Sequence, residues 1–412
     1  MGILARYAGL RSLWLGQLLS QLGNAVFLIM GLWEIQLHSP FLLAIAGLAM
    51  AVPQLLAAAG GVVVDRFHPG RLMLYTDLVR GLAVALGLAA LLLPGALIPA
   101  VIALLAVNSL GAALFGPAET TLLPRLVRAE DLTAANGVYN TTAQISGAVG
   151  AAIGGAAIAA IGVGWVFGFD MVSFWLSGLA IVIMLRTLGP WRAERAQEAA
   201  QEPQEGFAAS LLEGFRAVRR LPLMLDLLPL ILVANFAFMA GFTMLPYWIH
   251  HTLSVGALDY GLIDAAWAAG LVLGGLAAGA LRRWPIRDAA AAMFLLQGLL
   301  VGAFALSHLA WLSGVLLLLA GIANGIGNAI VFTLLQRLVP EEVRGRAFGV
   351  LFTLLGLANP LGSLAAGVFL HVLPLVWPWA LGAVSMLAIT IGIWRSTPRD
   401  LGWQADPPQV AE

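Results

Sequence analysis

A series of twelve apolar stretches, separated by short polar breaks, constrains this chain more than any other feature. A helix needs about 20 largely apolar residues to cross the hydrocarbon core of a bilayer, and each stretch reaches that length. We therefore predict an all-α polytopic membrane protein with twelve transmembrane helices. The predicted spans are 13–36, 41–64, 72–93, 97–119, 134–162, 164–187, 223–249, 257–281, 288–308, 310–335, 347–371 and 375–395.

The composition supports this prediction and excludes other classes of protein. Hydrophobic residues make up 61% of the chain and charged residues 10%, whereas a soluble protein carries about 25% charged residues to keep its surface hydrated. The absence of cysteine excludes disulfides and thiolate metal sites. The sequence has no P-loop, no H-E-x-x-H motif and no basic patch. We therefore expect no cofactor, no metal, no nucleic-acid partner and no enzymatic activity.

The distribution of arginine predicts the orientation in the membrane. All 21 basic residues are arginines, and every one except Arg80 lies in or beside an alternate polar break. Basic residues are enriched in cytoplasmic loops, so we expect both termini to be cytoplasmic. The alanine-rich, lysine-free composition is typical of a bacterial protein, and the predicted location is the bacterial inner membrane.

An internal repeat divides the chain into two halves. Residues 121–155 share 13 identical positions with the residues 212 further along the chain. The repeat preserves orientation and predicts two parallel six-helix halves, related by an axis along the membrane normal. The predicted parts are an N-terminal half (1–187), a cytoplasmic linker with an amphipathic helix (188–222), a C-terminal half (223–395) and a cytoplasmic tail (396–412).

Three motifs carry a family resemblance. Residues 61–71 read G-V-V-V-D-R-F-H-P-G-R, residues 150–155 read G-A-A-I-G-G, and residues 336–346 read Q-R-L-V-P-E-E-V-R-G-R. The first resembles the G-x-x-x-D-R-x-G-R gating signature of the major facilitator superfamily. The second is similar to the G-P-x-x-G-G signature of its exporters, with Ala151 in place of proline. The third resembles the branch that contains macrolide-efflux and enterobactin-exporter proteins.

The resemblance implies a monomeric secondary transporter that works by alternating access. It places a cytoplasmic gate at Asp65, Arg66 and Arg71, and close helix packing at glycines of the exporter motif and its repeat. The arginine that many proton-coupled drug antiporters of the family carry is absent from span 97–119, where Asn108 and Ser109 stand. The predicted packing glycines are Gly150, Gly154, Gly155, Gly362 and Gly367.

Charged residues inside the predicted spans are candidates for gating. A carboxylate at the centre of a membrane helix costs about 2.5–3.5 kcal/mol on insertion scales, so each needs a partner, a water-filled cavity or a proton. Asp77 and Arg80 are three residues apart, a spacing that places them on one helix face. We predict that they form a gating network with Asp65, Arg66 and Glu119; the alternative is a purely structural ion pair.

Three further carboxyl groups are candidates for proton coupling, because burial favours the protonated form of a carboxyl group. Asp264 is the first choice, since its span contains no arginine close to it. Glu34 has an alternative interpretation, as a residue that contacts water at the outer end of its helix. Asp170 precedes a Ser-Phe pair, a family pattern that implies a structural hydrogen bond.

Amide side chains recur at helical spacing in several spans and predict a substrate cavity. Their alternative role is interhelical hydrogen bonding, worth about 0.6–2 kcal/mol per contact. Phenylalanines beside one of them would form a soft apolar wall that tolerates varied ligands. The predicted cavity residues are Gln17, Gln21, Asn24, Asn108, Tyr139, Asn140, Gln144, Asn235, Phe238, Phe242, Asn324 and Asn328.

Together these features predict a proton-coupled exporter of a hydrophobic or amphipathic small molecule, such as a drug or a siderophore. Its partners would be that substrate, protons and membrane lipids. The alternative within transport is a lipid or lysophospholipid flippase, favoured by the missing arginine. A membrane scaffold or enzyme is a further alternative, against which the short loops and the absence of a nucleophile–base pair argue.

Overall fold

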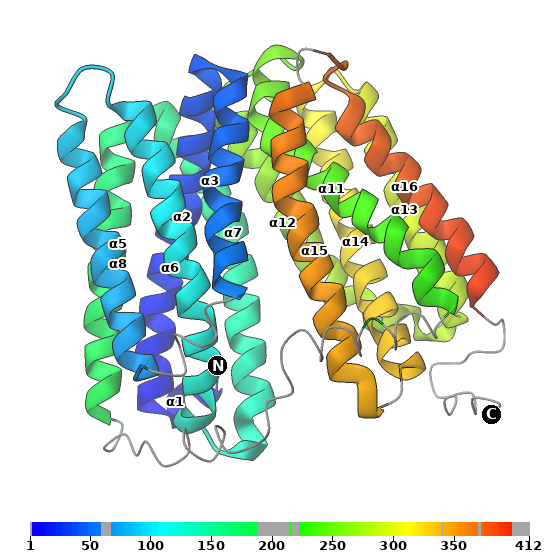
Figure 1. The fold of residues 1–412 in the computed structure, drawn as a ribbon, viewed down its shortest axis with the longest axis horizontal. Helices are drawn as coiled ribbons and strands as arrows, with labels where there is room; N and C mark the ends of the chain where they lie inside the picture. The colour runs from blue at the N-terminus through cyan, green and yellow to red at the C-terminus, as the bar shows by residue number, and fades with distance from the viewer. Residues whose placement is uncertain are drawn as a thin grey trace. The chain divides into compact units, whose positions relative to one another are not determined.

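The computed structural model describes residues 2–58, 67–187, 215, 222–339, 341–369 and 372–397. Each of the twelve predicted spans corresponds to one long helix within these residues (Figure 1). Ten of the helices are long and apolar enough to cross a membrane, and α3 adds a shorter apolar segment, Phe41–Pro53. The predicted amphipathic linker helix lies outside the described residues, apart from Phe215.

Most of the long helices continue past at least one end of the predicted apolar stretch, because backbone hydrogen bonding does not stop where the hydrophobic residues do. In the first half they are α2 (Ala8–His38), α3 (Pro40–Ala58), α5 (Pro69–Ala90), α6 (Leu97–Leu126), α7 (Leu132–Ala160) and α8 (Val163–Thr187). In the second half they are α11 (Pro222–His251), α12 (Ala257–Ala277), α13 (Ile286–Leu306), α14 (Ala310–Leu338), α15 (Glu341–Phe369) and α16 (Trp377–Ser396).

Three short elements were not predicted. They are α1 (Gly2–Arg6), η1 (Ala129–Asp131) and η2 (Ala278–Arg283). The first two are joined by a surface ion pair, in which Arg6 Nη1 lies 3.0 Å from Asp131 Oδ2. The Tyr7 hydroxyl also donates to Asp131 Oδ2, at 2.8 Å. These contacts fasten the N-terminus to the turn that leads into α7.

The described residues group into two compact units. The first contains those of Met1–Glu202 together with Thr243–Ala265, and the second those of Pro203–Phe242 together with Ala266–Glu412. The last turns of α11 and the first turns of α12 therefore belong to the first unit.

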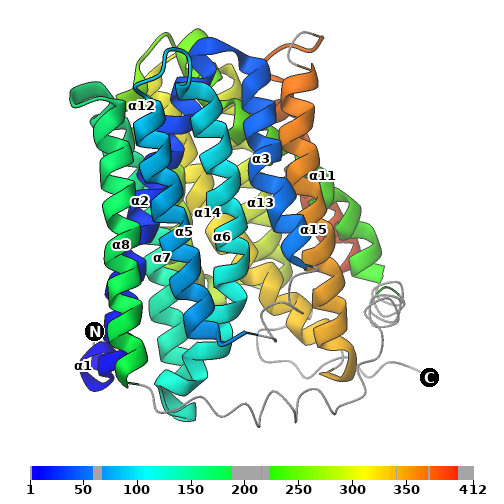
Figure 2. The same ribbon diagram turned by 60° about the vertical axis from the view of Figure 1, so that its left-hand side comes forward.

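The same neighbour relations occur at matching helices of the two halves. The third helix of the first half, α5, packs against α6 and α8, and its counterpart α13 packs against α14 and α16 (Figures 1 and 2). Helix α6 ends at Leu126 and α14 ends at Leu338, the 212-residue offset that the sequence repeat predicts. The fold is therefore built from two repeated six-helix halves.

Helix α2 is the centre of the first unit and packs against α7 and α8. Small residues allow these close approaches, as is common where membrane helices meet. A Cβ atom added at Gly16 would lie 3.1 Å from the Cα of Ser177 in α8. One added at Gly154 of α7 would lie 3.0 Å from the carbonyl oxygen of Val26. Glycine is needed at both contacts because a side chain would push the helices apart.

Candidate functional site: a buried charge cluster and polar helix faces

A charge cluster lies in the interior of the first unit, where α5 meets α6 and α8. Arg80 Nη1 lies 3.6 Å from Asp77 Oδ1, and the two side chains are only 6% and 0% exposed. Arg80 Nη2 also donates a hydrogen bond of 2.6 Å to the backbone oxygen of Asn108 in α6. Ser177 of α8 donates to Asp77 Oδ2 at 2.6 Å. The predicted pairing of Asp77 with Arg80 is therefore present.

A second carboxyl group, Asp170 of α8, belongs to the same cluster. It is fully buried and close enough to interact electrostatically with Arg80 and with the side chain of Asn108. Its oxygen atoms nevertheless lack a hydrogen bond of regular geometry. A Cβ atom added at Gly23 of α2 would lie 2.9 Å from Asp170 Oδ1. The cluster thus contains two carboxyl groups and one guanidinium group.

Two residues shape the space around Arg80. The guanidinium lies over the ring of Phe174, 5.3 Å from the ring centroid, where the face of the ring attracts a cation. A Cβ atom at Gly111 of α6 would overlap the Arg80 side chain. Glycine at position 111 therefore makes room for the arginine.

Only two of the other members of the predicted gating network, Arg71 and Glu119, lie within the described residues. Asp65 and Arg66 lie outside the described residues. Arg71 is exposed in the first turn of α5, and Glu119 of α6 is partly buried and interacts electrostatically with Tyr139 of α7. Asp77 and Arg80 have their described partners in Ser177, Asn108 and Asp170.

The predicted cavity residues of the first unit divide into two groups. Gln17 is buried, and its Nε2 donates to Ser177 at 3.5 Å, so it extends the charge cluster. Tyr139 is also buried. The remaining residues of this group are half-buried or exposed; they are Gln21, Asn24, Asn108, Asn140 and Gln144.

In the second unit the predicted amides join a short hydrogen-bonded chain. Asn328 donates to Asn324 at 2.9 Å, and Asn324 donates to Gln297 of α13 at 3.2 Å. Asn235 instead donates to the carbonyl oxygen of Ile231, one turn earlier in its own helix, at 2.9 Å. Sequence reasoning missed Gln297, because a single amide gives no periodic signal.

A half-buried aromatic surface lies beside α11 in the second unit. The ring centroid of Trp267 is 5.6 Å from that of Phe238, with the planes stacked, and 5.2 Å from that of Phe242. All three side chains are partly exposed. The two phenylalanines were predicted cavity residues, whereas Trp267 was missed, because one tryptophan within a long apolar helix has no distinguishing pattern.

The two remaining proton-coupling candidates are half-buried. Asp264 follows Tyr260 by one turn of α12, and the Tyr260 ring stacks on Trp33 of α2 at 5.9 Å. Glu34 lies one turn before His38, whose Nδ1 is 3.0 Å from the Glu34 carbonyl oxygen. Neither carboxyl group forms an ion pair with a described arginine.

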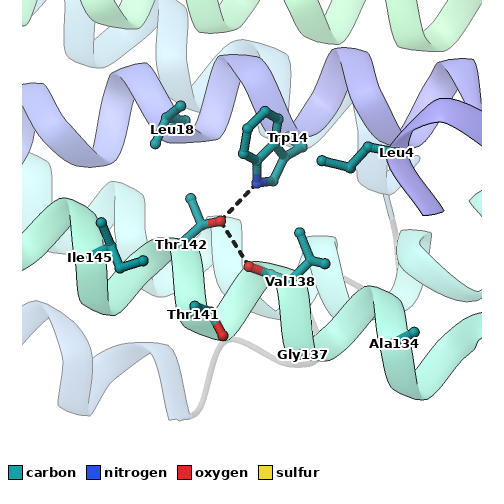
Figure 3. A pocket seen from close by; sticks show the side chains of 9 residues that line it. All are labelled: Leu4, Trp14, Leu18, Ala134, Gly137, Val138, Thr141, Thr142 and Ile145. Carbon is teal, nitrogen blue, oxygen red and sulfur yellow. Dashed lines mark hydrogen bonds between the residues drawn. The ribbon is translucent and has the colours of Figure 1, made fainter. Parts of the chain in front are cut away.

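A largely apolar cavity of 440 Å³ lies between α2 and α7, near the arginine-rich end of the first unit (Figure 3). Its polar feature is a pair of hydrogen bonds: Trp14 Nε1 donates to Thr142 at 2.7 Å, and the Thr142 hydroxyl donates to the Val138 carbonyl at 2.8 Å. The other lining residues are Leu4, Leu18, Ala134, Gly137, Thr141 and Ile145. The cavity can hold part of an amphipathic molecule.

Helix α12 makes two glycine contacts. In the first unit Gly261 meets Gly155 of α7. A Cβ atom added at Gly155 would lie 2.9 Å from the Cα of Gly261. In the second unit Gly270 meets Gly321 of α14. A Cβ atom added at Gly321 would lie 2.5 Å from the carbonyl oxygen of Trp267.

The other predicted packing glycines also lie at buried positions. Gly150 contacts Ala25 of α2, Gly362 contacts Phe236 of α11, and Gly367 is buried in α15.

Two repeated halves of six long helices, with polar helix faces and buried charges, are typical of a membrane transporter. The comparison with protein families agrees: the profile of the Major Facilitator Superfamily matches residues 13–363. The chain belongs to this superfamily and is a multi-pass membrane transporter, not an enzyme.

Relatives include proteins named for efflux. The chain is 29% identical over 361 residues to the multidrug efflux pump Tap of Mycolicibacterium fortuitum, covering 84% of this chain and 85% of Tap. It is 28% identical over 301 residues to the enterobactin exporter EntS of Salmonella paratyphi A, covering 71% and 68%. A solved D-xylose–proton symporter has the same fold, with a TM-score of 0.67, 15% identity and coverage of 95% and 97%.

Proposed function

We propose that this protein is a proton-coupled exporter of a hydrophobic or amphipathic small molecule, such as a drug or a siderophore. The observation that carries the substrate class is the 440 Å³ apolar cavity between α2 and α7, with one indole–hydroxyl pair at its wall. Ligand sites of this kind are mostly apolar, with a few polar groups that orient the ligand. The direction of transport is supported by the names of the relatives Tap and EntS.

The polar and aromatic helix faces support a substrate that has both a polar and an apolar part. The stacked rings of Phe238, Phe242 and Trp267 offer a flat apolar surface. The amides of Asn324 and Asn328 lie on α14, a helix of the same unit. The exposed amides on α7 provide further hydrogen-bonding groups. Such a mixture suits a molecule whose apolar part packs on rings while its polar part bonds to amides.

The proposed cycle follows from the repeat. The halves 1–187 and 223–395 would rock against each other around a site near the middle of the membrane. The gate would be formed by Asp65, Arg66, Arg71, Asp77, Arg80 and Glu119. The gate would be cytoplasmic, as would both termini, in the inner membrane of a bacterium. We expect the protein to act as a monomer, surrounded by lipids.

The function can be tested in proteoliposomes with an imposed pH gradient. The probes would be ethidium, a macrolide, a catecholate siderophore and a fluorescent lysophospholipid. An exporter should move at least one of the first three, at a rate that falls when the gradient is collapsed with a protonophore. Transport of none of these probes, or transport that ignores the gradient, would contradict the proposal.

A variant pair would link transport to the cavity. Trp14→Ala removes the indole at the cavity wall, so transport of the same probe should fall about tenfold. The matched control is Trp165→Ala, because Trp165 is exposed at the start of α8. Equal effects of the two substitutions would show that the cavity does not contact the substrate.

A lipid or lysophospholipid flippase is the second candidate. Two observations favour it: the cavity wall is largely apolar, and Asn108 and Ser109 stand where many proton-coupled drug antiporters have an arginine. A flippase should move the fluorescent lysophospholipid with no dependence on the pH gradient, while the other three probes remain in place.

A further inference from the structure

The buried cluster of the first unit has an unbalanced charge. Asp77, Arg80 and Asp170 are all buried, and together they hold two carboxyl groups and one guanidinium group. With both carboxyl groups ionised, the cluster would carry a net negative charge inside a membrane bundle. An uncompensated buried charge is costly, and such groups commonly neutralise instead. One bound proton makes the cluster neutral.

The hydrogen bonding leaves room for that proton. Asp77 Oδ2 accepts from Ser177, but Asp77 Oδ1 has no regular hydrogen bond, nor has either oxygen of Asp170. The Nε of Arg80 also lacks a partner within hydrogen-bond geometry. The guanidinium thus has an unused donor, and both carboxyl groups have unused acceptors. The arginine can pair with one carboxyl group while the other holds the proton.

No other charge on the packed helices takes part. Asp170 faces Gly23 from α2, Arg80 from α5 and the Asn108 amide from α6. The side chain of Asp77 meets Arg80 and Ser177. The other charged groups of these helices lie near helix ends: Arg11 and Glu34 in α2, Arg71 in α5, Glu119 and Arg125 in α6, and Arg186 in α8.

The repeated half shows that the fold does not require these charges. The equivalent helices α13 and α16 pack through Ala289, Ala290, Phe294, Met386 and Ile389. Their charged residues are Arg287 and Asp288 in the first turn of α13 and Arg395 in the last turn of α16. A role beyond packing is therefore needed to explain the cluster in α5 and α8.

We propose that Asp77, Asp170 and Arg80 form one proton-binding site, in which the two carboxyl groups share a single exchangeable proton. Binding transfers a proton from a hydronium ion, so one O–H bond of the donor breaks, a water molecule is released and one O–H bond forms on either carboxyl group. Loss of the proton leaves two carboxylates that compete for Arg80. Because the cluster joins α5, α6 and α8, the contacts between these three helices then depend on whether the proton is bound. This site rests on the proposed function, for which it would supply the coupling proton.

Infrared difference spectroscopy of the full chain in lipid, titrated with pH, tests the site without any substrate. The carbonyl stretch of a protonated carboxyl group is separate from that of a carboxylate. Asp170→Asn leaves the neutral pair Asp77–Arg80, and Asp77→Asn leaves the neutral pair Asp170–Arg80. Each single variant should therefore lose the same one protonated-carboxyl component. The control Asp288→Asn, in an ion pair of the second unit, should retain it.

Two outcomes would overturn the site. One is persistence of that component in both single variants, and the other is its loss in only one of them, since a shared proton requires both carboxyl groups.

A transport measurement separates this site from the proposed function. With ethidium as the probe, both single variants should lose gradient-driven uptake at least tenfold and keep ethidium exchange without a gradient. Loss of exchange as well would overturn the coupling role and indicate a structural one. If the infrared result holds but the wild type moves none of the probes, the proposed export function fails while the proton site stands.

Discussion

The helix pairs α5–α8 and α13–α16 occupy matching places in the two halves, yet their interiors differ in kind. The first pair encloses Asp77, Arg80 and Asp170, whereas the second buries alanine, phenylalanine, methionine and isoleucine together with the uncharged Gln297 and Ser385. Replacing a buried ion pair with apolar residues is often neutral or stabilising. The comparison therefore indicates that the common fold needs small and apolar residues at this place, and that the charges of the first half serve function.

The largest expected effect concerns the arginine that balances the cluster. Arg80→Met would leave two buried carboxyl groups without their cation and should destabilise the protein by about 3–5 kcal/mol. Arg287→Met should cost about 1 kcal/mol or less, because the Asp288 side chain left behind is 41% exposed to solvent. Unfolding in detergent, followed by circular dichroism, measures both variants. Equal losses would remove the contrast between the two helix pairs.

A second contrast lies within α12. Gly270→Ala would force a Cβ atom into the backbone of α14, where Gly321 Cα would be 3.0 Å away. Overpacking of this kind costs about 1–3 kcal/mol, so the unfolding temperature should fall. Gly275→Ala is the matched control in the same helix, because no atom lies within 4 Å of its added Cβ. If both alanines lowered stability equally, helix–helix contact would not be the cause.

A smaller effect on stability is expected at the cavity wall. Thr142→Val keeps the side-chain shape but removes the acceptor for the Trp14 indole, which should cost about 1 kcal/mol. Thr142→Ser keeps a hydroxyl group at the same position and should retain most of that stability. Indole fluorescence during denaturant unfolding would compare the two variants. A serine variant as unstable as the valine variant would assign the effect to packing instead of the hydrogen bond.

The smallest effect on stability is expected at the arginine-rich end of the first unit, where charged side chains contact water. Burial and the nearby Arg71 lower the pKa of His68, which precedes the first turn of α5. The unfolded chain therefore protonates His68 more readily than the folded chain does. The contribution of His68 to the free energy of unfolding is fully present above about pH 6.5 and is lost as the pH drops below it. His68→Gln should flatten that slope by less than about 1 kcal/mol. An unchanged slope would show that His68 does not cause it.

The helices could be predicted because hydrocarbon thickness fixes the length of an apolar stretch. Some of their ends could not, since α6 continues to Leu126 and α15 begins at Glu341, within polar turns where no hydrophobic signal remains. The Asp77–Arg80 pair followed from spacing within one helix. The inclusion of Asp170 depends on how α5 packs against α8, which a pattern along the chain does not encode.

The place that Gly111 makes for Arg80 has an evolutionary consequence. Any side chain at position 111 would overlap the guanidinium, so the two positions cannot change independently. Among descendants of a common ancestor, a larger residue at 111 should be found only where 80 has become smaller or uncharged, and the loss of the arginine should come first. A lineage that made that exchange would also be expected to lose one of the two aspartates, because the remaining charge would have no partner.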